Sequence, residues 1–221
     1  MKPALYPIFF LAVAVFLLIR SEILEQRRRV YVFKPIATLT VILIAALSFL
    51  EPAYHPIYTI GVLIGLLFSL GGDVALMFHG SRKAFAVGLG LFLVAHVAYT
   101  LVFLRLGRFS AWDLLWAVVL GAVAVGFYTL IRSNLGAMRA PVIGYIAVIT
   151  LMVSRSISTL ASPTFSTAQG VMIVAGAVLF YISDAILALN RFGRPWRYHR
   201  ISLAFYYSGQ MLLALAASYF V

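Results

Sequence analysis

Long apolar runs, separated by short polar connectors, follow one another along this entire chain. An α-helix needs roughly 17–25 predominantly apolar residues to cross the hydrocarbon core of a bilayer. The connectors between the runs leave no room for a soluble domain. We therefore expect transmembrane helices at residues 4–19, 35–50, 57–77, 84–104, 111–131, 141–160, 168–190 and 201–220.

The composition agrees with lipid as the solvent for these runs. Of the 221 residues, 64% are hydrophobic and only 10% are charged, whereas a soluble domain carries about 25% charged residues. The runs are continuously apolar instead of alternating with polar residues, which argues against a strand-built barrel. The predicted fold is an all-α integral membrane bundle of eight transmembrane helices, forming a single transmembrane domain over residues 1–221.

The first run is interpreted as a retained helix. It follows one lysine and precedes the arginines at 27–29, whereas a secretory signal carries its positive charges ahead of the apolar segment. Pro35 and Pro141 are expected near the starts of the second and sixth helices, because a missing backbone N–H costs little there.

Basic residues are concentrated on alternate connectors, which predicts the orientation in the membrane. Of the 17 basic residues, Lys2, Arg105 and Arg108 belong to one side and Arg155 lies inside a run. The other side holds the remaining 13, namely Arg20, Arg27, Arg28, Arg29, Lys34, Arg82, Lys83, Arg132, Arg139, Arg191, Arg194, Arg197 and Arg200. The positive-inside rule assigns this side to the cytoplasm, with both termini outside it. The net charge of +11 therefore reflects topology and attraction to anionic lipid, and does not indicate nucleic-acid binding.

Two carboxylates lie inside apolar runs. Asp73 comes four residues before the end of the third run, and Asp184 comes six before the end of the seventh. Both runs cross in the same direction, so the two depths differ by about 3 Å at about 1.5 Å per residue. An ionisable side chain there costs at least about 2.5–3.5 kcal/mol and normally faces the bundle interior or a wet cavity. One aspartate could simply bond to a neighbouring helix, but two at matched depth predict a shared cavity.

Small residues near the first aspartate indicate an inward face. Gly61, Gly65, Ser69 and Asp73 recur at every fourth position, and small residues at this spacing let transmembrane helices approach closely. The stripe by itself is more typical of helix packing than of chemistry. It nevertheless predicts that the carboxylate points toward other helices and not toward lipid.

Other polar residues at similar depth are further candidates for the site. They are His96 and Tyr99 in "AHVAY", Tyr207 and Gln210 in "YYSGQ", Ser183 beside the second aspartate, and Lys34 in "FKP". His96 could orient a carboxylate or respond to its charge, whereas an interhelical hydrogen bond is the default for Tyr99. Lys34 either snorkels toward the interface or acts as counter-ion to an aspartate or a lipid phosphate. Arg155 lies too far toward the outer side to reach either aspartate, and its partner is not predicted.

The interval between the two aspartates is half the length of the chain. His96 follows Asp73 at the same distance along the sequence as Tyr207 follows Asp184, and "GDVAL" aligns with "SDAIL". Two four-helix repeats in parallel orientation would produce this spacing and would place the site at their interface. Similar helix lengths alone would also produce it.

The available side chains favour acid–base chemistry. The chain has no cysteine, and His55, His79 and His199 fall in connectors, whereas a zinc site needs three or four protein ligands. Ser208 with His96 would be a conceivable nucleophile and base, but no motif supports the pair. Two carboxylates in a low-dielectric cavity can share one proton, so that one donates while the other stays ionised. This suits hydrolysis through an oxocarbenium-like transition state, proton-coupled transport or intramembrane aspartyl proteolysis.

Short motifs at these positions together resemble one known family. They are "KP" at 34–35, "GD" at 72–73, "AHVAY" at 95–99, "SD" at 183–184, and the late Tyr207 and Gln210. In this order and spacing, over nearly the whole chain, they resemble the YhhN-like family of multi-spanning membrane proteins, which includes the vertebrate lysoplasmalogenases. The resemblance implies hydrolysis of the vinyl ether bond of a lysoplasmalogen-type lysophospholipid, giving a fatty aldehyde and a glycerophospho-alcohol. It implies no metal or organic cofactor, membrane lipid as the other partner, and a bacterial cytoplasmic membrane as the location.

The resemblance also implies roles for the candidate residues. One aspartate would protonate the alkene carbon, and the other would stabilise the resulting oxocarbenium ion or act as base. Lys34 would hold the lipid phosphate, and the residues expected to orient the pair or bind substrate are His96, Tyr99, Ser183, Tyr207 and Gln210.

Alternative functions stay open at this stage. The substrate could be another lysolipid or enol ether, and the chain could be a non-enzymatic lipid or proton-coupled transporter. An intramembrane aspartyl protease is a weaker interpretation, because Leu70 stands where the GxGD motif of those enzymes has its first glycine.

Overall fold

The computed structural model describes residues 2–78, 80–194 and 196–220 of the chain. Over these residues the chain is helical and contains no strand, and eight of its helices are long and apolar enough to cross a membrane. The all-α, multi-pass prediction is therefore confirmed. The helices are α1 (Tyr6–Ile23), α2 (Arg27–Ala46), α3 (Pro56–Leu76), α4 (Arg82–Leu106), α5 (Ala111–Ile131), α6 (Arg139–Ile157), α7 (Thr167–Phe192) and α8 (Ser202–Ala216).

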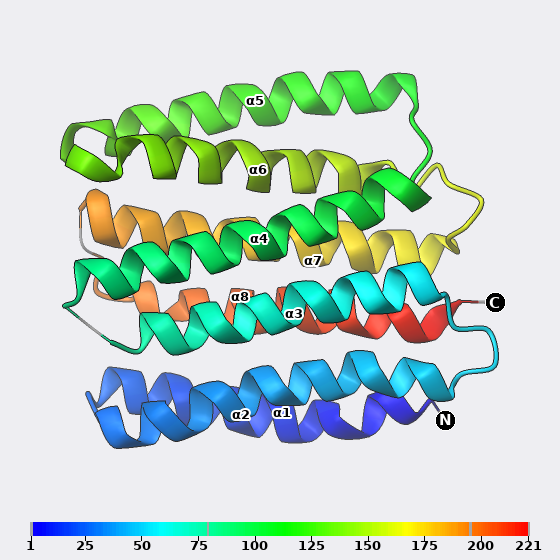
Figure 1. Ribbon diagram of the computed structural model, residues 1–221, viewed down its shortest axis with the longest axis horizontal. Coiled ribbons are helices and arrows are strands. Elements are labelled where there is room, and N and C mark those ends of the chain that lie inside the picture. The colour runs from blue at the N-terminus through cyan, green and yellow to red at the C-terminus, as the bar shows by residue number, and fades with distance from the viewer. Residues whose placement is uncertain (1, 79, 195, 221) are drawn as a thin grey trace.

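The helices lie side by side and alternate in direction (Figure 1). The connections α1–α2, α3–α4, α5–α6 and α7–α8 all lie at one end of the bundle. We call this the basic end, because these connections and the helix turns beside them carry the 13 basic residues grouped above. The start of α1 and the end of α8 lie at the opposite end (Figure 1).

The observed bounds follow the expected ones closely, with one exception. Helix α5 matches its expected range, and Pro141 lies in the first turn of α6 as predicted. Helix α2, however, begins at Arg27 and contains Pro35 in its interior, so the predicted helix start at Pro35 is wrong. Arginine is a good helix former, and the helix continues beyond the apolar core because its backbone hydrogen bonds form equally well in the polar interface. His79, expected in a connector, lies outside the described residues.

Arg155 has a partner that the sequence did not identify. Its guanidinium lies 3.6 Å from the carboxylate of Asp113, which is buried in the first turn of α5. Asp113 also accepts hydrogen bonds from the Ser110 backbone N–H at 2.6 Å and from the Ser158 hydroxyl. The cluster ties the start of α5 to the end of α6, at the end of the bundle opposite to the basic end.

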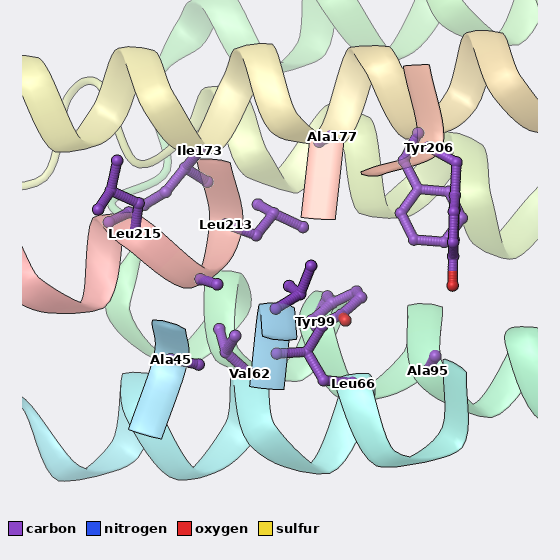
Figure 2. Packing of buried hydrophobic residues seen from close by; sticks show 14 of the residues in the cluster. Ala45, Val62, Leu66, Ala95, Tyr99, Ile173, Ala177, Tyr206, Leu213 and Leu215 are labelled. Atoms are coloured by element: carbon purple, nitrogen blue, oxygen red, sulfur yellow. The ribbon is translucent and has the colours of Figure 1, made fainter. Parts of the chain in front are cut away.

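Close contacts fix the two helix pairs that carry the buried aspartates. Gly65 of α3 lies against the ring of Tyr99 on α4, where a side chain on the glycine would clash. Gly176 of α7 and Gly209 of α8 face each other so closely that a Cβ on either would lie within 3 Å of the other's carbonyl oxygen. Small residues permit this approach of helix backbones. Figure 2 shows the core between these pairs, with Tyr99 and Tyr206 among its side chains.

Candidate active site

A cavity of about 310 Å³ lies in the half of the bundle near the basic end. Asp73 of α3 and Asp184 of α7 both line it, as expected from their matched depth. The other polar lining residues include Lys34, Ser183, Tyr206, Glu22, Asn190, Arg191, His199 and Arg200. The structure thus brings two carboxylates from distant parts of the chain to the wall of one polar space.

Asp73 is the more enclosed of the two carboxylates, with 2% of its surface exposed. Lys34 of α2 lies 3.3 Å from its Oδ1 atom. The hydroxyl of Thr38 donates to Oδ2 at 2.6 Å, and the hydroxyl of Tyr206 on α8 donates to the same oxygen at 2.7 Å. Both oxygens are therefore engaged, and the buried negative charge is compensated by a buried lysine.

Helix geometry explains how α2 supplies two of these partners. Lys34 and Thr38 are four residues apart and so lie on one helical face. Tyr207 reinforces this face, because its hydroxyl donates to the Lys34 backbone carbonyl at 3.1 Å and lies 3.2 Å from the Thr38 hydroxyl. Tyr207 thus acts on Asp73 indirectly, by holding Lys34 and Thr38 of α2. Of the predicted alternatives for Lys34, the observed geometry is that of a counter-ion to an aspartate.

Asp184 has a different environment. Its side chain is 14% exposed, and its Oδ2 atom accepts a hydrogen bond from the hydroxyl of Tyr145 on α6. The Nε2 atom of His96 on α4 lies 3.3 Å from the same carboxylate oxygen and 2.9 Å from the Tyr145 hydroxyl. Among the described residues, no lysine or arginine lies within 4 Å of this carboxylate and nothing donates to its Oδ1 atom. Asp184 therefore presents a free oxygen near the cavity.

Within the described parts of the chain, three of the predicted orienting residues make no hydrogen bond to either carboxylate. Ser183 lines the cavity without a hydrogen bond to an aspartate. The hydroxyl of Tyr99 and both amide atoms of Gln210 are buried, and they have no hydrogen-bond partner within the described parts of the chain. The orienting roles of these residues stay predictions.

Three contact residues were not identified from sequence. Thr38 could have been found one helical turn after Lys34, and Tyr206 beside Tyr207 in the same motif. Tyr145 follows Lys34 at the same interval as Asp184 follows Asp73. The repeated interval was therefore a usable signal for the tyrosine that holds Asp184.

The arrangement offers unlike environments for two acidic groups. One carboxylate is paired with a lysine, and the other contacts a phenol and an imidazole. Carboxylates whose surroundings differ in this way can take separate acid and base roles in one reaction. Over residues 2–78, 80–194 and 196–220, no three His, Asp or Glu side chains converge in the manner of a metal site.

The fold and the cavity define a class: a multi-spanning membrane protein with two carboxylates on the wall of one cavity in its helical bundle. The model of the YhhN family matches residues 29–217, and the chain belongs to this family. The family predicted from the motifs is confirmed.

Curated relatives carry a more specific name. The lysoplasmalogenase TMEM86A of Bos taurus is 32% identical over 176 residues, which cover 74% of this chain and 67% of the relative. The protein of the same name from Homo sapiens is 32% identical over 167 residues, with the same coverage of both chains. No solved structure matches the chain.

Proposed function

We propose that this protein is a membrane hydrolase that cleaves the vinyl ether bond of lysoplasmalogen-type lysophospholipids. The products are a fatty aldehyde and a glycerophospho-alcohol. The observation that carries the proposal is the pair of carboxylates on one cavity wall, in a chain whose relatives are named lysoplasmalogenases. The basic end faces the cytoplasm, because the positive-inside rule assigns the arginine-rich connections to that side.

The reaction needs an acid, a base and one water molecule. A general acid protonates the alkene carbon that is not bonded to oxygen, which breaks the double bond and leaves an oxocarbenium ion. Water adds to the oxygen-bearing carbon and loses one proton to a base, so that a hemiacetal forms. The hemiacetal transfers its hydroxyl proton to the glycerol oxygen as that C–O bond breaks, giving an aldehyde and an alcohol. Paired carboxylates perform the corresponding steps in glycoside hydrolysis.

Accessibility assigns the roles. A general acid must come within hydrogen-bond reach of the atom that it protonates. Asp184 has one oxygen without a donor among the described residues, whereas Asp73 has both oxygens occupied. We therefore assign Asp184 as the general acid; once it has given up that proton, its carboxylate is the base that takes the proton lost by the water molecule. Asp73, held by Lys34 and Tyr206, supplies the fixed negative charge that stabilises the oxocarbenium ion.

Purified protein supplied with a lysoplasmalogen tests the proposal through the release of fatty aldehyde. Asp184→Asn should lower the rate by about 10²–10⁴-fold, the usual contribution of a positioned acid or base. Asp73→Asn should lower it by about 10²–10³-fold, because a fixed charge that stabilises the oxocarbenium ion is lost. Asp113→Asn is a matched control, because Asp113 is equally buried but lies at the opposite end of the bundle. Full activity in Asp184→Asn, or uptake of intact lysolipid into vesicles without aldehyde release, would overturn the proposal. The second outcome would indicate a transporter.

A further inference from the structure

An apolar groove of about 50 Å³ adjoins the carboxylate cavity between α4, α6 and α7. Its walls include Phe85 and Leu89 of α4, Phe127 of α5, Ile146 of α6 and Ala188 of α7. The lining is otherwise aliphatic or aromatic, and Asp184 is its only aspartate or glutamate among the described residues. The groove therefore offers an apolar surface that ends at the carboxylate assigned as the acid.

The groove and the cavity share part of their walls. Leu76, Phe85, Phe92, Asp184 and Leu187 line both spaces. Asp184 thus lies where an apolar space meets a polar one.

Among the described residues that line the cavity, the arginines and the lysine differ in whether a carboxylate compensates them. Lys34 is paired with Asp73, and Arg200 is paired with Glu22 at 2.8 Å. Arg191 also lines the cavity, and no carboxylate lies within 4 Å of it in the described parts of the chain. Its guanidinium lies 5.0 Å from the ring centre of Phe85, a residue of the shared wall. An anionic group in the cavity would therefore meet an uncompensated arginine close to the groove.

We propose that the groove binds the first few carbons of the substrate's alkyl chain while Arg191 binds its phosphate, with the vinyl ether bond lying at Asp184. This inference rests on the proposed function and adds how the substrate is positioned in the site. In a lysoplasmalogen the vinyl ether bond joins the glycerol to the chain, so the reactive carbons lie at the boundary between polar and apolar parts. Asp184 occupies the same boundary in the protein. Arginine suits the head group because its planar fork matches phosphate oxygens.

Binding of an unreactive ligand tests the chain site without relying on catalysis. The probes are saturated 1-alkyl lysophosphoethanolamines with ethyl to hexadecyl chains, titrated against purified wild type and variants, and affinity should rise with each carbon only until the groove is filled. Ala188→Phe narrows the groove, and each methylene that it excludes should weaken binding of the long chains by about fourfold. Phe127→Ala widens the groove and should shift the preferred chain toward longer ligands. Ala168→Phe, at an exposed position of α7 far from the groove, is the control and should match wild type.

A second pair of variants tests whether Arg191 binds the phosphate. Arg191→Gln should weaken binding of the hexadecyl lysophospholipid by about tenfold, the value of a charge-assisted hydrogen bond, and should leave hexadecylglycerol unaffected. Arg194→Gln, three residues along and outside the cavity lining, should change neither ligand. Glycerophosphoethanolamine, which has the head group but no chain, should compete only weakly, which separates a lysolipid site from a site for free phosphate.

The outcomes separate this proposal from the proposed function. Aldehyde release with the same chain-length profile in wild type, Ala188→Phe and Phe127→Ala would overturn the chain site and leave the function standing. Chain-dependent binding that these variants shift, without aldehyde release from any lysoplasmalogen, would support the chain site and overturn the proposed function. Equal binding of a diacyl phospholipid would mean that the groove holds a tail of bulk membrane lipid, and would also overturn the proposal.

Discussion

The surroundings of Asp73 and Asp184 match in position but differ in chemistry. Lys34 on α2 contacts the first aspartate, and Tyr145 on α6 contacts the second. The interval between these two contact residues along the sequence equals the interval between the two aspartates. Each aspartate is also reached from the other half of the chain, Asp73 by Tyr206 and Asp184 by His96. The pattern is what two four-helix repeats facing one cavity would give, and the repeat stays a prediction.

The difference between the two environments teaches which aspartate is free to react. A lysine at the first position gives a compensated ion pair that is closed to the cavity on most sides. A tyrosine at the equivalent position contacts the second carboxylate, which among the described residues has no lysine or arginine within 4 Å and has one oxygen that accepts no hydrogen bond. The proposed roles, a fixed charge at Asp73 and an acid at Asp184, follow from this difference.

The largest effect expected from this comparison concerns Asp184. Asp184→Asn should abolish most aldehyde release, by about 10²–10⁴-fold, and should change the free energy of unfolding little, because the amide oxygen can still accept from Tyr145. Activity assays together with denaturant unfolding in detergent measure both quantities. A large loss of stability together with retained activity would show that Asp184 has a structural role and is not the acid.

Asp73→Asn, unlike Asp184→Asn, should strongly lower the free energy of unfolding. Asp73→Asn leaves Lys34 buried without a counter-ion and should lower the free energy of unfolding by about 3–5 kcal/mol. The double variant Lys34→Met with Asp73→Asn removes both charges and should recover most of that loss. Unfolding curves of the two variants decide the matter, since equal stability of the single and double variants would argue against the ion pair.

The two tyrosines sharpen the contrast further. Tyr145→Phe should lower aldehyde release by about tenfold, the kinetic equivalent of the roughly 1.4 kcal/mol that one hydrogen bond contributes. Tyr206→Phe should instead lower the free energy of unfolding by about 1–3 kcal/mol, because the buried Asp73 carboxylate loses a hydrogen-bond donor. Each variant serves as the control for the other. Identical effects on activity and stability in both would contradict the proposed division between a reactive and a fixed carboxylate.

The smallest effect is expected at Tyr99. Its hydroxyl is buried without a partner among the described residues, so Tyr99→Phe removes a desolvated group that makes no hydrogen bond and should not lower the free energy of unfolding. It should also leave aldehyde release unchanged. A marked loss of activity with unchanged stability would instead restore the predicted orienting role of this residue.

The sequence by itself determined the eight helices and the depth of the two aspartates. A membrane-spanning segment must satisfy its backbone hydrogen bonds internally, so length and hydropathy define a helix without reference to its neighbours. Depth follows from counting residues along that helix. The motifs also sufficed to predict the family, because they depend on order and spacing alone.

Only the tertiary structure decided which side chains meet. Hydropathy leaves the rotation of each helix about its axis and the choice of its neighbours open, because lipid solvates every apolar face equally well. Close packing at Gly65 fixes the faces on which α3 and α4 meet, and packing at Gly176 and Gly209 does so for α7 and α8. The assembled bundle also brings α2 to α3 and α6 to α7, where Lys34 meets Asp73 and Tyr145 meets Asp184. It likewise forms the groove that Asp184 lines.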